Sequence, residues 1–255
     1  MIETPSSYGR IVWREYITHD LESAKQFYGG LFGWTWKAVS AGEGEPPYTV
    51  VLNGTDGVAG MLSVGRKPGT PYWTPYVHVE EVDRVFERAI AHGATAMLPP
   101  EDVPGVGRIA FLRDPQGAFF YLFRAVSPDK PETAPQPGEF RWDQLETSDT
   151  NAATAFYTEV LGWEIVPAGP ISFISPRPRN YPMAVMHGVP EEIPPHWLPY
   201  VMVADLEATN AKAKGLGGEI IERRIEVPGS GAFALLKDRD GARFMLAEMP
   251  FSSKV

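Results

Sequence analysis

Hydrophobic and polar positions follow a regular order of strand and helix signals in the first half of the chain. Residues Arg10–Ile17 alternate and include β-branched and aromatic side chains, which is typical of a strand. Asp20 then offers a helix N-cap, and Gly33 offers a stop. Between them apolar residues recur at helical spacing: Leu21, Ala24, Phe27, Tyr28 and Leu31. Further strands are expected at about 35–39, 48–52 and 58–64.

The same order then starts again. We expect a strand at 76–79, a helix at 82–91 closed by Gly93, and strands near 95–98, 108–112 and 119–123. This first part of the chain therefore contains βαβββ twice. Segregated helices beside mixed or antiparallel strands make the predicted fold class α+β rather than doubly wound α/β.

The second half of the chain repeats the first. Trp13 and Trp34 are matched by Trp142 and Trp163, each 129 residues later (142 − 13 and 163 − 34). A second set of pairs follows at an offset of 124, namely Trp73 with Trp197, Pro104-Gly105 with Pro228-Gly229, and Asp114 with Asp238. So many aromatic, glycine and proline matches in one order indicate a duplication, so we predict four βαβββ units in one chain.

The boundary between the two copies is a proline-rich segment. Residues 127–138 contain four prolines among polar residues, which predicts a semi-extended linker. We therefore expect one module at 1–126 and a second at 139–255. A length of 255 residues suits two ordinary domains.

Composition narrows the class of protein. A net charge of −9 gives no support to nucleic-acid binding, and the longest apolar stretches are far too short to span a membrane. The absence of cysteine excludes disulfides and thiolate metal sites. Residues Met1–Pro5 lack the basic start and apolar core of a signal peptide. We expect a cytoplasmic protein.

Two motifs carry a resemblance to a known family. They are Asp20-Leu21-Glu22-x-Ala24-x-x-Phe27-Tyr28-x-x-Leu31-Phe32-Gly33-Trp34 and Asp114-Pro115-Gln116-Gly117-Ala118-x-Phe120, and both recur in the second half. Together they resemble the vicinal oxygen chelate superfamily of glyoxalases, bleomycin-resistance proteins and extradiol dioxygenases. The chain is most similar to its tandem members in actinobacteria, often labelled hydroxylases or 27–30 kDa antigens. The resemblance implies tandem glyoxalase-like modules packed as a pseudo-dimer in a monomer, with further oligomerisation left open.

The resemblance also implies where a metal would bind. Metal-using members place ligands on the first strand, early in the strand that opens the second unit, and on the last strand. In this chain those positions hold Trp13, Thr74 and Tyr121, and in the second module Trp142, Leu198 and Met245. None is an ordinary ligand for a hard or borderline divalent ion. We therefore expect no metal and no other cofactor.

Strand alternation indicates which side chains share the face of these six positions. In the first module they are Trp13, Glu15, Thr74, Tyr76, His78, Phe119, Tyr121 and Phe123. In the second they are Trp142, Gln144, Glu146, Leu198, Tyr200, Met202, Arg243, Met245 and Ala247. Mostly apolar walls with few polar groups are typical of small-molecule sites. The pairs Trp13/Trp142 and Trp34/Trp163 are either core residues or stacking surfaces, and the core is favoured for the second pair.

Three functions remain open. The first is metal-independent binding of a small apolar or aromatic metabolite. The second is an enzyme of lyase, isomerase or oxygenase type, in which Glu15, His78 and Tyr121 are the acid–base candidates because a carboxylate can orient a histidine base. His196 is a lesser candidate at the pocket mouth. The third is an interaction or regulatory protein whose pockets are filled by their own aromatic side chains.

Overall fold

A computed structural model describes residues 8–40, 47–64, 69–127, 136–177 and 181–249. Most of the predicted linker lies outside these residues. The first module contains β1 (Ile11–Thr18), α1 (Leu21–Phe32), β2 (Thr35–Val39), β3 (Tyr48–Asn53), β4 (Asp56–Ser63), β5 (Tyr72–His78), α2 (Val82–Ala91), β6 (Thr95–Val103), β7 (Gly107–Arg113) and β8 (Phe119–Ala125). The second contains β9 (Phe140–Thr147), α3 (Thr150–Leu161), β10 (Glu164–Ala168), β11 (Ile171–Ser175), β12 (Ala184–Gly188), β13 (His196–Met202), α4 (Leu206–Gly215), β14 (Glu219–Val227), β15 (Gly231–Lys237) and β16 (Arg243–Glu248).

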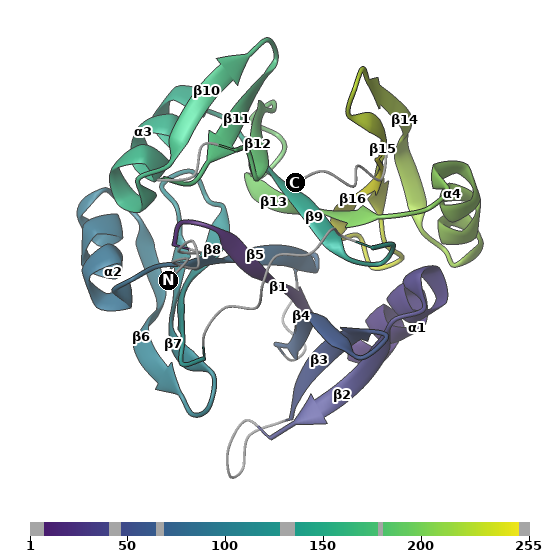
Figure 1. Cartoon of the computed structure of the whole chain (residues 1–255), viewed down its shortest axis with the longest axis horizontal. Coiled ribbons are helices and arrows are strands. Elements are labelled where there is room, and N and C mark those ends of the chain that lie inside the picture. The colour runs from purple at the N-terminus through teal and green to yellow at the C-terminus, as the bar shows by residue number, and fades with distance from the viewer. Residues whose placement is uncertain (1–7, 41–46, 65–68, 128–135, 178–180, 250–255) are drawn as a thin grey trace, which may run out of the picture. The chain divides into compact units, whose positions relative to one another are not determined.

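The predicted α+β class and the four βαβββ units are confirmed (Figure 1). Each module forms one eight-stranded sheet, in the orders β2-β3-β4-β1-β5-β8-β7-β6 and β10-β11-β12-β9-β13-β16-β15-β14. In every unit the first strand pairs in parallel with the fourth, while the last three strands pair antiparallel as hairpins. Strands therefore pair within a module, which the sequence had left open.

Local chemistry sets the helix ends as expected. The Asp20 carboxylate accepts the Ser23 amide at 2.9 Å, and Asp149 caps the equivalent helix α3. Gly33 and Gly162 end these helices with φ of 75° and 69°, a backbone conformation that favours glycine.

Two strands differ from the prediction. Strand β5 begins at Tyr72, and β6 continues to Val103 through two consecutive prolines. Strand β6 is the edge of its sheet, and its pairing with β7 shifts register on either side of Leu98. Prolines are tolerated in bulged edge strands, so β6 continues through the two prolines at which the predicted strand ended.

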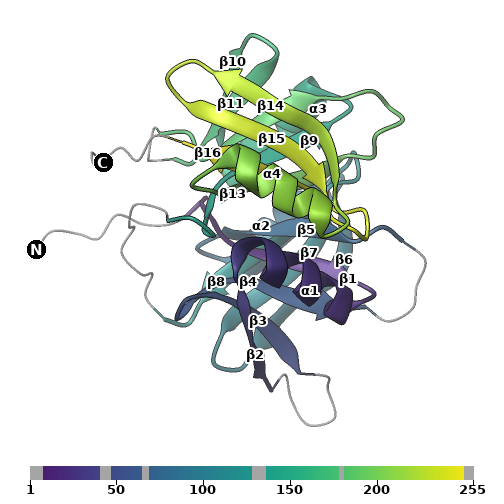
Figure 2. The same cartoon turned by 90° about the vertical axis from the view of Figure 1, so that its right-hand side faces the viewer.

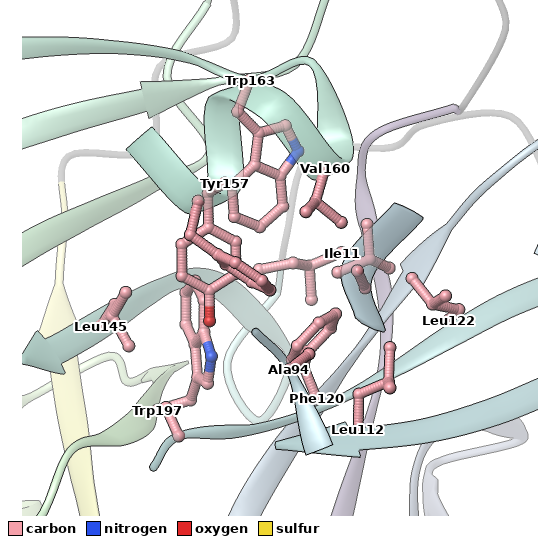
Figure 3. Packing of buried hydrophobic residues seen from close by; sticks show 14 of the residues in the cluster. Ile11, Ala94, Leu112, Phe120, Leu122, Leu145, Tyr157, Val160, Trp163 and Trp197 are labelled. Carbon is pink, nitrogen blue, oxygen red and sulfur yellow. The ribbon is translucent and has the colours of Figure 1, made fainter. Parts of the chain in front are cut away.

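The chain divides into two compact units, each built from one half of each module. Unit 1 contains Met1–Trp13, Thr74–Pro131 and Asp143–Trp197. Its helix α2 lies against β6, β7 and β8, and its core gathers Phe120 from β8 with Tyr157 and Trp163 from the second module (Figures 1 and 3). The Trp163 indole donates to the Gly9 carbonyl at 2.7 Å, and the Tyr157 hydroxyl donates to Asp114 at 2.9 Å.

Unit 2 contains Arg14–Trp73, Glu132–Trp142 and Leu198–Val255, and it repeats these contacts. Helix α4 lies against β14, β15 and β16 (Figure 2). The Trp34 indole donates to the Gly138 carbonyl at 2.8 Å, and the Tyr28 hydroxyl donates to Asp238 at 2.9 Å. The aromatic motif of each module therefore binds the Asp-x-x-Gly turn of the other module. The preference for a core role of Trp34 and Trp163 is confirmed, since both are buried.

Candidate ligand-binding faces

In unit 1, four rings form what we call the aromatic ladder: Tyr76 on β5, Tyr121 and Phe119 on β8, and Phe111 on β7. Tyr76 stacks on Tyr121 with ring centroids 4.1 Å apart, and Tyr121 stacks on Phe111 at 4.3 Å. These separations are close to the spacing of neighbouring strands, about 4.8 Å, so the rings stand side by side on the sheet. Tyr76 and Tyr121 are both buried.

Thr74 lies on the same strand as Tyr76 and is fully buried. Its hydroxyl donates to the Phe119 carbonyl at 3.0 Å. The residue at this superfamily ligand position therefore ties β5 to β8.

His78 is buried at the end of β5 among other rings. Tyr8 lies edge-on to it with centroids 5.2 Å apart, and Phe123 lies 6.1 Å away. The His78 amide donates to the Arg10 carbonyl at 2.8 Å, and the Gly9 amide donates to the His78 carbonyl at 2.7 Å. These two backbone hydrogen bonds hold the residues just before β1 beside His78.

Glu15 belongs to unit 2 and has different surroundings. It is fully buried, it accepts the Tyr48 hydroxyl at 2.8 Å, and it lies in register with Gly60. The pairing of Glu15 with His78 therefore stays a prediction.

The second module contributes an apolar cluster to unit 2. Its buried members lie on β13 and β16: Leu198, Tyr200, Met202, Met245 and Ala247. Trp142, Phe233 and Leu235 pack against it and are partly buried. Arg243 is half-buried at the start of β16, in register with Lys237. The structure thus brings together most of the residues that alternation placed on this face.

Polar groups of the second module gather in unit 1. Glu146 on β9 is buried, and its carboxylate lies 3.5 Å from the His196 ring and accepts the Gln144 amide at 3.3 Å. His187 lies in register with Glu146 on β12. Sequence reasoning grouped Gln144 with Glu146 but did not pair either with His196, because alternation along one strand says nothing about the neighbouring strand.

The side chains at the six superfamily ligand positions do not fit a metal ion. The Tyr121 ring stacks in the aromatic ladder, and the Thr74 hydroxyl donates to the Phe119 carbonyl. Leu198 and Met245 lie in the apolar cluster. Trp13 and Trp142 are half-buried indoles. Elsewhere in the described parts of the chain, no three His, Cys, Asp or Glu side chains are arranged to hold a metal ion. No helix among the same residues is long and apolar enough to cross a membrane.

Comparisons with known proteins identify the family of this fold. A family model described as the glyoxalase/bleomycin resistance protein/dioxygenase superfamily matches residues 10–121, and a glyoxalase-like domain model matches residues 143–247. "Putative glyoxylase CFP32" of Mycobacterium tuberculosis is 30% identical over 240 residues, which cover 91% of this chain and 92% of that protein. "Anthracycline biosynthesis protein DnrV" of Streptomyces peucetius is 30% identical over 94% of each chain.

Solved structures share the fold at low identity. The 2,3-dioxygenase LapB from Pseudomonas sp. KL28 has a TM-score of 0.66 and 14% identity, with 98% of this chain and 97% of that chain covered. The Mn(II)-bound glyoxalase from Novosphingobium aromaticivorans has a TM-score of 0.67 and 15% identity, with 97% and 85% covered.

Proposed function

This chain belongs to the glyoxalase/bleomycin resistance protein/dioxygenase superfamily, and from that premise we propose that it binds small, flat, largely apolar or aromatic metabolites without a metal ion. The observation that carries the proposal is the chemistry of the superfamily ligand positions. Three rings, two apolar chains and Thr74 occupy them. Tyr121 belongs to the aromatic ladder of unit 1, and Trp142, Leu198 and Met245 belong to or pack against the apolar cluster of unit 2. Surfaces of this composition favour hydrophobic and stacking contacts over ion coordination.

The name of one relative supports an aromatic ligand. One relative that covers nearly the whole chain is called an anthracycline biosynthesis protein, and anthracyclines are flat, fused-ring aromatic compounds. We therefore propose metabolites with fused aromatic rings as the ligand class. Ring edges in the ladder would contact the face of such a ligand, and the methionines of the apolar cluster would adapt to its outline.

Binding of an anthracycline and of 1-methoxynaphthalene, measured by fluorescence, tests this proposal. Tyr121→Met places the second module's residue in the ladder, and Tyr200→Leu removes the ring of the apolar cluster. Each aromatic contact stabilises by about 1 kcal/mol, so each variant should weaken binding at its own face about five- to tenfold. Tyr181→Leu, at a tyrosine that is 37% exposed, is the matched control.

Two outcomes would contradict the proposal. If neither probe binds the wild-type protein, the pockets are filled by their own rings and the scaffold-only function is favoured. If the purified protein holds a stoichiometric transition metal and chelation abolishes probe binding, the metal-free part of the proposal is wrong.

A second candidate function, proton-transfer catalysis on the same ligands, is favoured by the contact between Glu146 and His196. The other His196 ring nitrogen lies 2.8 Å from the Pro194 carbonyl, so both nitrogens face oxygens and a protonated ring would satisfy both. Such a pair can hold and move a proton. If Glu146→Gln abolishes turnover of a ligand while probe binding persists, the pair takes part in catalysis and an enzyme is supported. If turnover is unchanged in that variant, this pair takes no part in the chemistry.

A further inference from the structure

A small cavity lies in unit 1 where α2 leads into β6 and β7 turns into β8. It is lined by Gly93 and Thr95 on one side and by residues 113–117 on the other, and its volume is about 240 Å³. Pockets that hold a whole drug-sized ligand usually measure about 300–1,000 Å³. This cavity therefore suits one polar group of a ligand better than a complete ring system.

The cavity adjoins the aromatic ladder. Arg113 on β7 lies in register with Thr95 on β6 and with Phe119 on β8. Register partners project from the same face of a sheet, so the three side chains form one row across strands about 4.8 Å apart. Phe119 stacks on Phe111 with ring centroids 5.4 Å apart, and both residues are partly exposed. A ligand ring that packs against Phe119 therefore lies one strand away from Arg113.

Arg113 supplies a positive charge that the described residues do not neutralise. It lines the cavity and is exposed, and it has no hydrogen-bond or ion-pair partner in the part of the chain that the structure describes. A guanidinium presents its N–H donors in a planar fork that matches the two oxygens of a carboxylate. Thr95 is exposed beside it and adds a hydroxyl.

The negative groups around the cavity have their own partners. Asp114 is buried, one of its oxygens accepts three backbone amides of its own turn, and the other accepts the Tyr157 hydroxyl at 2.9 Å. The carbonyls in the last turn of α2 accept the amides of residues 92–94. An incoming group therefore meets Arg113 as the available charge.

The second module fills the equivalent place with an ion pair. Glu219 stands for Thr95 and Lys237 for Arg113 at the offset of 124 (219 − 95 and 237 − 113), and the two charged groups lie 3.1 Å apart. Over the seven lining positions the second copy has three carboxylates and two cations, whereas the first has one of each. The first copy thus keeps the cation and lacks the carboxylate that would pair with it.

We propose that this cavity binds the carboxylate of an aromatic acid. The Arg113 fork donates to both carboxylate oxygens, and the ring of the acid packs against Phe119 and Phe111 at the partly exposed end of the ladder. Arginine–carboxylate pairs of this bidentate kind fix the orientation of a ligand as well as its affinity. This inference rests on the proposed function for the aromatic ring, and it adds the anionic group that the ligand carries.

The test compares 1-naphthoate with 1-naphthamide, which share the ring system and the planar substituent and differ in charge. Binding is measured by fluorescence at pH 7 in about 0.15 M salt, where charges more than about 8 Å apart are largely screened. Wild-type protein should bind 1-naphthoate about fivefold more tightly, as expected of one arginine–carboxylate pair that water can still reach.

Two substitutions at exposed residues should remove this preference. Arg113→Gln takes away the charge and should leave the affinity for 1-naphthamide unchanged. Thr95→Glu places a carboxylate in register with Arg113, which it should neutralise as Glu219 neutralises Lys237. Arg84→Gln is the matched control, because Arg84 is 76% exposed near the other end of α2 and its loss removes the same charge from unit 1. This control should keep the preference.

The outcomes separate the two proposals. If 1-naphthamide binds the wild type and 1-naphthoate binds no better, the carboxylate subsite is wrong and aromatic binding stands. The subsite is also wrong if Arg113→Gln keeps the preference, or if Arg84→Gln removes it to the same extent. If neither compound binds, the proposed function and the subsite are both wrong.

Discussion

Removing the Asp238 carboxylate should destabilise the protein more than any single change at a pocket face. Asp238 is buried in the turn before β16, where one oxygen accepts the amides of Asp240 and Ala242, each at 2.9 Å. Its other oxygen accepts the hydroxyls of Tyr16 at 2.5 Å and Tyr28 at 2.9 Å. Both tyrosines are fully buried, so their hydroxyls have no contact with bulk solvent.

The magnitude follows from these four bonds. A buried donor that loses its partner costs about 1–3 kcal/mol, and Asp238→Ala leaves two phenols and two amides without theirs. Part of this loss is offset, because burial raises the pKa of Asp238 and the variant no longer buries a charge. We expect a net loss of about 4 kcal/mol, a large share of the 5–15 kcal/mol that usually stabilises a fold. Tyr16→Phe removes one bond and leaves no donor behind, so it should cost about 1–2 kcal/mol.

Urea unfolding followed by tryptophan fluorescence would measure both values. A double-mutant cycle adds a sharper test, because the cost of Tyr16→Phe should nearly vanish in the Asp238→Ala background. Leu145 stands in the place of Tyr16 in the second module (145 − 16 = 129), so among the described residues Asp114 accepts one phenol, Tyr157, where Asp238 accepts two. Additive costs in the cycle, or a neutral Asp238→Ala, would refute the reasoning.

Three further predictions rest on single contacts. Gly60→Ala should cost about 1–3 kcal/mol in urea unfolding, since the methyl group displaces the Tyr48 hydroxyl, and an unchanged midpoint would argue against the close approach. Gly107→Ala and Gly231→Ala should each reduce soluble expression or lower Tm by several degrees. A Cβ would overlap the Arg124 carbonyl at Gly107, where φ is 155°, and the Glu248 carbonyl at Gly231, where φ is 120°. Tm values equal to that of the wild type would contradict this prediction. Finally, burial raises the pKa of Tyr16, Tyr28 and Tyr157 well above 10, so these phenols ionise first in the unfolded state. Their contribution to stability is therefore complete below about pH 10 and declines as the pH rises further. A midpoint that stays constant from pH 9 to 11 would contradict the burial of Tyr16, Tyr28 and Tyr157.

Much of the fold could be predicted because local signals agree with it. Helix α2 has the predicted bounds, and the caps at Asp20, Gly33, Asp149 and Gly162 lie where side-chain chemistry and backbone conformation place them. The exchange of halves between compact units could not be predicted. Tyr28 and Tyr157 occupy equivalent positions, and a sequence pattern cannot say whether each bonds to the aspartate of its own module or of the other.

The sequence predicts which side chains share one face of a sheet. It does not predict which side chains on neighbouring strands they contact. Alternation along β13 and β16 grouped Leu198, Tyr200 and Met245 correctly, because those strands are regular. The side chain beside Glu15 depends instead on strand order and register, which bring Tyr48 across β4 from a strand two places away. Gly60, in the middle of an apolar strand, was the sequence signal that could have located this approach.

The two copies keep one frame and present two different surfaces, and their energetics explain why. The repeated tyrosine–aspartate and tryptophan–carbonyl bonds are buried, so a change in either copy would leave a partner unsatisfied at a cost of about 1–3 kcal/mol. On the pocket faces the partners of a side chain differ between the copies as well, since Thr74 bonds to the Phe119 carbonyl and its equivalent Leu198 packs in the apolar cluster. Equivalent positions there differ in polarity or shape: Glu15 and Gln144, Ile17 and Glu146, Thr74 and Leu198, His78 and Met202, Tyr121 and Met245. With a carboxylate–phenol pair in one module and a carboxylate–imidazole pair in the other, the two faces should bind different ligands or different parts of one ligand.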